Sequence, residues 1–304
     1  MITVEKTATG LIISTEKKIS FVARPLHTVR TIFAHLAELW LYRELIRNLV
    51  IRDLKVRYRN STLGFLWSLG NPLLMMIVFT FVFTVMTGYS KAEKFPVFVL
   101  CGILPWNFFS ASVIGSIRSI VDNAPLVSKV YFPRVVLPVS LVLANMINFL
   151  LALVVLFVFI LIFRIPLTVW VLLLPAVIAV QVIFTIGVAL ILATMNVFYR
   201  DTQVIMEVLM LAWFFMTPIF YPVELLPRNY ELWSFTFDVW RWMNILNPMA
   251  SIIATYRVVL YGSGYGGAPP EFYFFMRTLI TSLGILGIGA FIFYRYSRTF
   301  AEAV

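Results

Sequence analysis

The sequence is poor in charged residues and in the side chains that bind metals. Only 12% of its 304 residues are charged, whereas 61% are hydrophobic, and the mean hydropathy is +0.93. Soluble domains carry about 25% charged residues, so the composition excludes an ordinary soluble domain and indicates an integral membrane protein. The single cysteine, Cys101, excludes an intrachain disulfide, and with two histidines the chain offers few metal ligands, so we expect no metal site.

Motifs for nucleotide binding and for enzyme chemistry are also missing. No G-x-x-x-x-G-K-[ST] loop is present, and the glycine-rich stretch at 261–270 has no lysine, so we interpret that stretch as an external loop. The carboxylates are scattered rather than paired as metal-assisted transfer chemistry requires. We therefore expect this chain to bind no cofactor and to catalyse no reaction by itself.

Six apolar stretches are long enough to cross about 30 Å of hydrocarbon, which takes about 20 residues each. They lie at about 63–87, 95–118, 135–163, 167–197, 203–222 and 273–294. We therefore predict an all-α integral membrane protein with six transmembrane helices in one domain, 63–298. An even number of spans places both termini on one side of the membrane.

The basic residues predict which side that is. Of the 24 lysines and arginines, 17 fall on the side of the termini, and cytoplasmic segments are the ones enriched in such residues. Both termini are therefore expected in the cytoplasm. The net charge of +10 is interpreted as topology signalling and headgroup contact, and no nucleic-acid partner is expected, because the basic residues lie beside apolar runs.

An amphipathic helix is predicted at 39–62, before the first span. Tyr42, Leu45, Ile46, Leu49 and Val50 share one apolar stripe, as in a helix lying in the membrane interface. From residue 51 the pattern changes phase, which predicts a bend or a change of partner near 50–52. Two interpretations stay open: a plain interfacial anchor, or a charged cytoplasmic gate that contacts lipid headgroups. The gate would consist of Arg52, Lys55, Arg57, Tyr58 and Arg59. Residues 1–38 form an N-terminal extension to which no role is assigned.

Four stretches carry a resemblance to a known family. "RDLKVRYRNSTLGFLWSLGNP" (52–72), "NVFYRDT" (196–202), "MTPIFYPVELLP" (216–227) and "ILNPMA" with "YR" (245–250, 256–257) occur in the family's order. Together they resemble the membrane subunits of ATP-binding-cassette (ABC) polysaccharide exporters over about 38–298. The resemblance implies a permease of the bacterial cytoplasmic membrane that exports a lipid-linked polysaccharide such as O-antigen, capsule or teichoic acid.

The resemblance also implies partners. It predicts a homodimer bound to two separate nucleotide-binding subunits, which would hold the ATP and Mg. Two alternatives stay open: a related ABC exporter for a lipid or drug, and a membrane-embedded glycosyl- or phosphotransferase.

The loop at 122–138 is the candidate contact with an ATPase. Pro125 and Pro133 bracket a segment too apolar for an exposed loop, and exposed apolar patches rimmed by charge usually mark an interface. In the family this loop resembles the coupling helix; the alternative is a loop packed against its own spans. The predicted coupling residues are Leu126, Val127, Lys129, Val130, Tyr131, Phe132 and Arg134.

The resemblance places the first and fifth spans around a channel, where aromatic rings would offer a moving sugar chain weak contacts. The candidate channel residues are Phe65, Trp67, Phe79, Phe83, Trp213, Phe214, Phe220 and Tyr221. Prolines and tryptophans after the fifth span predict short external helices that re-enter the bilayer before the last span, with a purely extracellular cap as the alternative. That region is marked by Pro222, Pro227, Trp233, Trp240, Trp242 and Pro248.

Two features inside the predicted spans break the apolar pattern. Glu207 is an ionisable residue in the fifth span, and such a residue is a functional candidate. Near the cytoplasmic edge it could snorkel or meet Arg200 or the 52–59 cluster, and a structural ion pair is favoured. Asn71 and Pro72 predict a kink in the first span, whose freed backbone groups would pair inside the protein.

Overall fold

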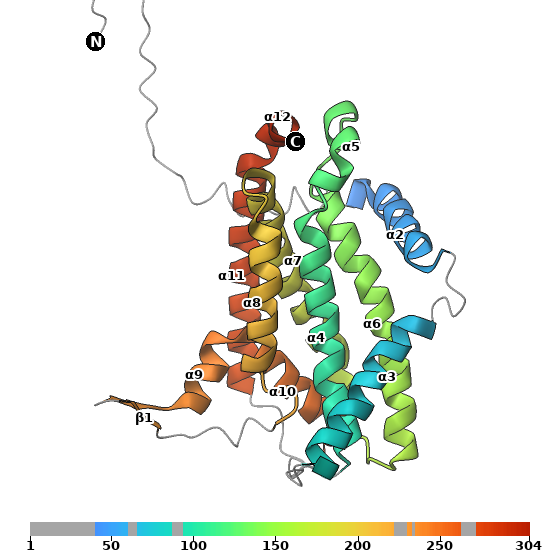
Figure 1. Ribbon diagram of the computed structural model, residues 1–304, viewed down its shortest axis with the longest axis vertical. Coiled ribbons are helices and arrows are strands. Elements are labelled where there is room, and N and C mark those ends of the chain that lie inside the picture. The colour runs from blue at the N-terminus through green and yellow to red at the C-terminus, as the bar shows by residue number, and fades with distance from the viewer. Residues whose placement is uncertain (1–39, 60–65, 87–93, 222–229, 233–234, 263–271) are drawn as a thin grey trace, which may run out of the picture. The chain divides into compact units, whose positions relative to one another are not determined.

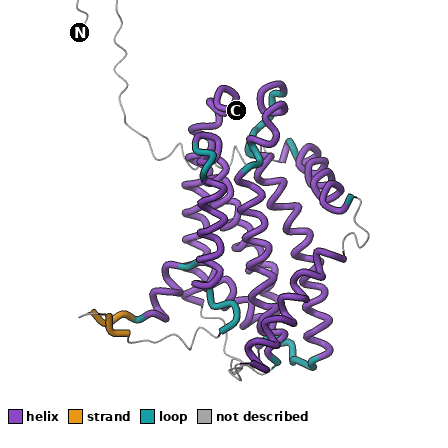
Figure 2. Tube along the Cα trace, viewed as in Figure 1, coloured by secondary structure: helices purple, strands orange, loops and turns teal. Residues whose placement is uncertain are grey.

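The fold is a bundle of long helices (Figures 1 and 2). This computed structural model describes residues 40–59, 66–86, 94–221, 230–232, 235–262 and 272–304. The described residues from Tyr42 onward belong to one compact unit, Tyr42–Val304.

The elements follow one another along the chain with short connections. The helices are α2 (Arg43–Tyr58), α3 (Leu66–Thr80) continued by the π-helical η1 (Phe81–Met86), α4 (Phe95–Ile117), η2 (Val121–Asn123), α5 (Ala124–Lys129), α6 (Val136–Ile162), η3 (Val169–Leu173), α7 (Leu174–Phe198), α8 (Thr202–Met216), α9 (Val239–Leu246), α10 (Pro248–Leu260), α11 (Phe272–Tyr296), η6 (Ser297–Thr299) and α12 (Phe300–Ala303). Two strands, β1 (Tyr230–Leu232) and β2 (Phe235–Phe237), lie between α8 and α9.

Four helices in the described part of the chain have the length and composition of a membrane span. They are Phe95–Ile117, Val136–Ile162, Val169–Phe198 and Tyr273–Ala303, and they correspond to the predicted second, third, fourth and sixth spans. The predicted first and fifth spans form shorter apolar helices, Gly70–Met86 and Thr202–Met216. The fifth is short because Pro218 follows it, and proline restricts the backbone of the residue before it.

The centre of the bundle is α4. Its buried residues lie on every side of the helix, as is typical of a helix enclosed by others. It packs against α3, α6, α7, α8 and α10. Phe98, Phe109 and Ile117 are fully buried on it. This helix therefore forms the shared wall of the two cavities described below.

The chain between α8 and α11 forms more structure than the predicted short helices. The helices α9 and α10 are present, and an antiparallel hairpin that was not predicted precedes them, pairing Tyr230 with Phe237. The Asp238 carboxylate accepts a hydrogen bond from the Arg241 amide at 2.9 Å and starts α9. The next helix, α10, packs against α4, α7 and α11, so it belongs to the bundle rather than to a surface cap.

Small residues bring α7 and α11 into backbone contact. A Cβ at Gly187 would lie 2.7 Å from the Leu286 nitrogen, and a Cβ at Gly289 would collide with the Gly187 carbonyl oxygen. Helix pairs in membranes associate through such close van der Waals packing because apolar surface alone gives them no preference over lipid.

This contact predicts a stability difference between two glycines of α11. Gly289→Ala is expected to destabilise the protein by about 1–3 kcal/mol because the added methyl group has no room. The matched control is Gly287→Ala, where a Cβ meets nothing within 4 Å and where alanine improves helix propensity. Thermal unfolding in detergent measures both; equal melting temperatures would contradict the close approach.

Candidate functional site

The predicted gate helix, α2, is one continuous helix that packs along α6. Leu49 and Val50 of the predicted apolar stripe are buried, and no break occurs at 50–52. At its end, Arg57 Nη1 donates to Asn145 Oδ1 at 2.8 Å, and the Tyr58 hydroxyl donates to Asn148 Oδ1 at 2.7 Å. These two bonds attach the end of α2 to one face of α6.

The middle of α2 is connected to the loop before α5. Arg52 Nη1 donates to Asn123 Oδ1 at 3.3 Å, and Arg52 Nη2 pairs with Asp53 at 3.1 Å. Lys55 and Arg59 are exposed. The basic cluster thus has two parts: side chains that contact the bundle and side chains that face outward.

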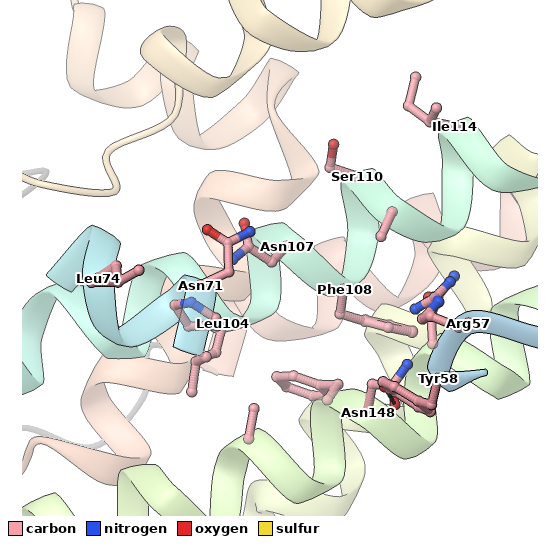
Figure 3. Close-up of a pocket in the computed structure, with 15 residues that line it drawn as sticks. Arg57, Tyr58, Asn71, Leu74, Leu104, Asn107, Phe108, Ser110, Ile114 and Asn148 are labelled. Atoms are coloured by element: carbon pink, nitrogen blue, oxygen red, sulfur yellow. Dashed lines mark hydrogen bonds between the residues drawn. The ribbon is translucent and has the colours of Figure 1, made fainter. Parts of the chain in front are cut away.

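A cavity of about 770 Å³ lies where α2, α3, α4 and α6 meet. In Figure 3, Arg57, Tyr58 and Asn148 group on one side of it and Asn71 and Asn107 on the other. Arg57 is the one charged residue among the described residues that line it. This larger cavity therefore carries positive charge and several amides.

Two amide donors beside this cavity lack acceptors. Asn145 Nδ2 and Asn148 Nδ2 have no hydrogen-bond partner, because Arg57 and Tyr58 occupy the amide oxygens and leave the nitrogens as donors. Both nitrogens are covered by neighbouring protein atoms, so an acceptor reaches them only after a side chain shifts. Together with the guanidinium of Arg57, they give this region an excess of donors.

A smaller cavity of about 310 Å³ lies between α3, α4 and α8. Phe79, Trp106, Phe214 and Glu207 are among its lining residues. The two cavities share three residues of one face of α4, namely Asn107, Ser110 and Ile114. The cavities are therefore neighbours along one wall.

Glu207 does not form the ion pair that was predicted for it. Its carboxylate accepts a hydrogen bond from Gln203 Nε2 at 2.9 Å, one turn earlier on α8. The described ion pairs are Arg47–Glu44, Arg52–Asp53 and Arg118–Asp122, and none of them includes Glu207. The residue is exposed and lines the smaller cavity.

Aromatic rings from α3, η1 and the end of α8 meet in one cluster. The ring centroids of Phe79 and Phe220 lie 4.5 Å apart, those of Phe83 and Phe220 lie 5.8 Å apart, and those of Phe214 and Phe220 lie 5.1 Å apart. Four of the predicted channel residues therefore come together. Tyr221 is partly buried beside them, whereas Phe65 and the side chain of Trp67 lie outside the described residues.

Trp213 faces the interior instead. Its ring lies 5.1 Å from that of Phe109, and its Nε1 donates to Asn247 Oδ1 at 2.9 Å. Asn247 in turn donates to Thr217 Oγ1 at 2.9 Å, and its Oδ1 also accepts from the Ala250 amide at 3.3 Å, which starts α10. One asparagine thus connects the end of α8 to the start of α10.

Arg257 holds the chain just after α8. It is 2% exposed, and its Nη1 donates to the Pro218 carbonyl at 2.7 Å while its Nη2 donates to the Ile219 carbonyl. The guanidinium carbon also lies 3.7 Å from the centroid of the Phe98 ring. Gly102 allows this approach, since a Cβ there would lie 2.9 Å from the Ile219 oxygen. Described residues of the three motif stretches 216–227, 245–250 and 256–257 therefore meet at one place.

A second buried polar group supports α10. The Tyr256 hydroxyl donates to Gln181 Oε1 at 2.8 Å, and Gln181 Nε2 donates to the Pro105 carbonyl at 2.7 Å. These bonds join α10, α7 and α4. Together with Arg257 they fix α10 inside the bundle.

The predicted coupling segment is the short helix α5 with the six residues that follow it. Pro125 stands in its first turn, as expected for proline. Val127 is buried, whereas Tyr131 is 100% exposed and Val130 is also exposed; Lys129 is exposed, and Leu126, Phe132 and Arg134 are partly buried. The C-terminal helix α12 packs against α5, and Figure 1 shows both at the same end of the bundle.

The predicted external region is described in part. Pro222, Pro227 and Trp233 lie outside the described residues, and so does the side chain of Trp240. Trp242 is half exposed, and Pro248 is buried in the first turn of α10. The described residues of this region lie at the end of the bundle opposite to α5 (Figure 1).

Comparison with known proteins identifies the family. A family model described as "ABC-2 type transporter" matches residues 44–261. The chain belongs to the ABC-2 type transporter family. The family membership predicted from the four motifs is thereby confirmed. The ABC-2 match also indicates a transport subunit rather than an enzyme.

Several relatives match nearly their whole length. The chain is 38% identical over 267 residues to the O-antigen export system permease protein RfbA of Myxococcus xanthus. This match covers 88% of this chain and 98% of the relative. It is 32% identical to an RfbA of Klebsiella pneumoniae, covering 83% and 91%. It is also 24% identical to the polysialic acid transport protein KpsM of Escherichia coli, covering 78% and 88%.

Sequence reasoning missed several residues of this ABC-2 chain that line the cavities. Trp106, Asn107 and Ser110 lie on α4, and Asn145 and Asn148 lie on α6. A signal for them existed, because an amide within a predicted span has to find a partner or an aqueous surface. Their position at a common wall depends on how α4 and α6 pack, and the linear pattern does not contain that.

Arg257 generates a prediction for this ABC-2 chain. Arg257→Met is expected to cost about 1–3 kcal/mol of stability, since the buried carbonyls of Pro218 and Ile219 lose their donors. Arg257→Lys should not restore it, because an ammonium lacks the planar fork that bonds both carbonyls. Thermal unfolding of the purified protein measures the loss, with the exposed Arg241→Met as control. Wild-type stability of both Arg257 variants would show that the fork is dispensable.

Proposed function

We propose that this chain is the transmembrane subunit of an ABC exporter that moves a lipid-linked polysaccharide across the bacterial cytoplasmic membrane. The observation that carries the proposal is the match to O-antigen export permeases over 88% of the chain and 98% of the Myxococcus xanthus relative. Energy would come from ATP hydrolysed with Mg on a separate partner subunit, in line with the ABC-2 family match. The two cavities along α4 supply a polar and aromatic surface suited to a sugar chain.

The exposed face of α8 supports a homodimer. This helix exposes a large apolar surface in which a carboxylate, Glu207, is also exposed. A carboxylate facing hydrocarbon is costly, so this face is better covered by a second copy and a water-filled path. In this proposal α3 with η1 and α8 are the first and fifth of six spans. The termini are then cytoplasmic, and α9 and α10 re-enter from outside.

The chemistry of the path fits a polymer that slides. The rings of Phe79, Trp106 and Phe214 offer faces to the C–H groups of sugars, while Asn107 and Ser110 offer hydrogen bonds. Transport requires sites weak enough for the cargo to leave. A mixed surface of this kind provides many weak contacts and no single tight one.

The larger cavity suits the anionic headgroup of the lipid carrier. Arg57 provides charge-assisted hydrogen bonds for phosphate oxygens, and the covered amide nitrogens of Asn145 and Asn148 would add neutral ones once a side chain shifts. Arg59 and Lys55 are exposed nearby on α2 and would attract the headgroup from the cytoplasmic leaflet. In this way α2 acts as a gate rather than as an anchor alone.

The surface around α5 is the proposed contact with the ATPase. Tyr131 is a fully exposed ring beside the exposed Lys129, which is the composition of an interface patch. A displacement of the segment around α5 would reach α2 through the bond between Asn123 and Arg52. Force from ATP hydrolysis would thus act on the gate helix.

Copurification tests the proposed function. The full-length chain is expected to copurify with a Walker-motif ATPase, and a lipid-linked glycan should stimulate ATP hydrolysis by the reconstituted complex. Tyr131→Ala should lower export at least about tenfold at an unchanged rate of ATP hydrolysis, because it removes the exposed ring from the contact. Tyr199→Ala, another exposed tyrosine, is the matched control. Transport by the purified chain without any ATPase would contradict the proposal.

The headgroup site has its own test. The double substitution of Arg57→Gln and Arg59→Gln is expected to slow export about tenfold or more, since a charge-assisted hydrogen bond is worth about 1.5–3 kcal/mol. The yield of assembled complex should stay within about twofold. Arg47→Gln, on the same helix but paired with Glu44 at the surface, is the control. A larger effect on assembly than on export would favour a simple interfacial anchor.

A further inference from the structure

Glu207 is an exposed carboxylate on α8, an apolar helix. It lies five residues after Thr202, the first residue of α8, or about 7.5 Å along the axis at 1.5 Å per residue. Val204, Val208 and Leu211 are exposed on the same helix. Carboxylates in membrane spans face a protein interior or an aqueous cavity rather than lipid, and Glu207 lines the smaller cavity.

The charge at this position has no nearby cation to balance it. None of the described residues that line the smaller cavity is basic, and the carboxylate accepts a hydrogen bond from the neutral amide of Gln203 at 2.9 Å. A neutral donor adds no positive charge, whereas a basic partner would offset the field of a carboxylate. Glu207 therefore projects a negative field into the smaller cavity.

The larger cavity has the opposite sign. Arg57 is its one charged residue among those described. The two cavities meet at Asn107, Ser110 and Ile114, which are uncharged. Along this wall the surface passes from positive beside α2, through neutral amide and hydroxyl groups, to negative at α8.

We propose that Glu207 makes this path selective for uncharged glycans, while the anionic phosphate of the carrier is held at Arg57. The inference rests on the proposed function and adds the substrate class to it. Like charges a few ångströms apart repel more strongly in a confined site than in bulk water, and charged side chains set ion selectivity in pores in this way. Sugar hydroxyls can donate to the carboxylate, so a neutral chain meets an acceptor, whereas a carboxylated or sulfated chain meets a like charge.

The test compares two probes on one complex. The chain with its ATPase subunit is reconstituted in nanodiscs of phosphatidylethanolamine and phosphatidylglycerol. The probes are a farnesyl-diphosphate-linked neutral trisaccharide and the same molecule ending in glucuronic acid. The readout is the ratio of the two concentrations that half-maximally stimulate ATP hydrolysis, acidic over neutral. We expect a ratio of about 10 or more, falling at high salt because the path is aqueous.

Substitutions at Glu207 test whether its charge causes the difference between the two probes. Glu207→Gln should lower the ratio to about 2 or less, and Glu207→Lys should invert it, since only the charge at one exposed position changes. Asp201→Asn is the matched control, because it removes a carboxylate from an exposed residue of the same region that makes no capping hydrogen bond. This control should keep the wild-type ratio.

The outcomes separate the two proposals. Equal responses to both probes in the wild type, or an unchanged ratio in both Glu207 variants, would overturn the selectivity while leaving the export function intact. Stimulation by neither probe would contradict the proposed function, and the selectivity would fall with it. A ratio that follows the charge at residue 207 supports both.

Discussion

The guanidinium of Arg257, enclosed among backbone carbonyls, is the interaction on which the geometry of this bundle depends. Inside a membrane every backbone polar group has to find a partner within the protein. Pro218 interrupts the helical hydrogen bonding after α8, and Arg257 donates to the carbonyls of Pro218 and Ile219. Asn247 likewise accepts a hydrogen bond from the Trp213 side chain and donates one to the Thr217 hydroxyl. An irregular turn is thereby held against α4, and the position of α8 follows from it.

That position shapes the surface proposed for transport. Because the end of α8 is fixed, Phe214 and Phe220 meet Phe79 from α3, and a cavity remains between these helices and α4. On the other side of α3, the end of α2 is bonded to the two asparagines of α6. Hydrogen bonds and packed rings thus border the two cavities, whose linings combine apolar side chains with amides, Arg57 and Glu207.

Features that depend on residues close together in the sequence could be predicted, whereas contacts between residues far apart in the sequence could not. Helix periodicity depends on residues three or four apart, so the long helices and the buried stripe of α2 were predictable. The motifs predicted the family, and the family match confirmed it. The ion pair predicted for Glu207 is absent among the described residues, because a residue close in sequence to basic side chains need not lie close to them in space. In the structure α8 turns this residue toward α3 and α4. The inward orientation of Trp213 could not be predicted either, because its partner Asn247 lies 34 residues later in the sequence.

The packing of α12 against α5 ties the chain's last residues to the surface proposed to receive mechanical input. Phe300 is fully buried, with its ring 5.2 Å from that of Phe293, so the tail is anchored rather than loose. A label attached after α12 would therefore lie beside the surface proposed to contact the ATPase, and removal of α12 would uncover one side of α5. Engineering of this protein is better directed to other exposed loops.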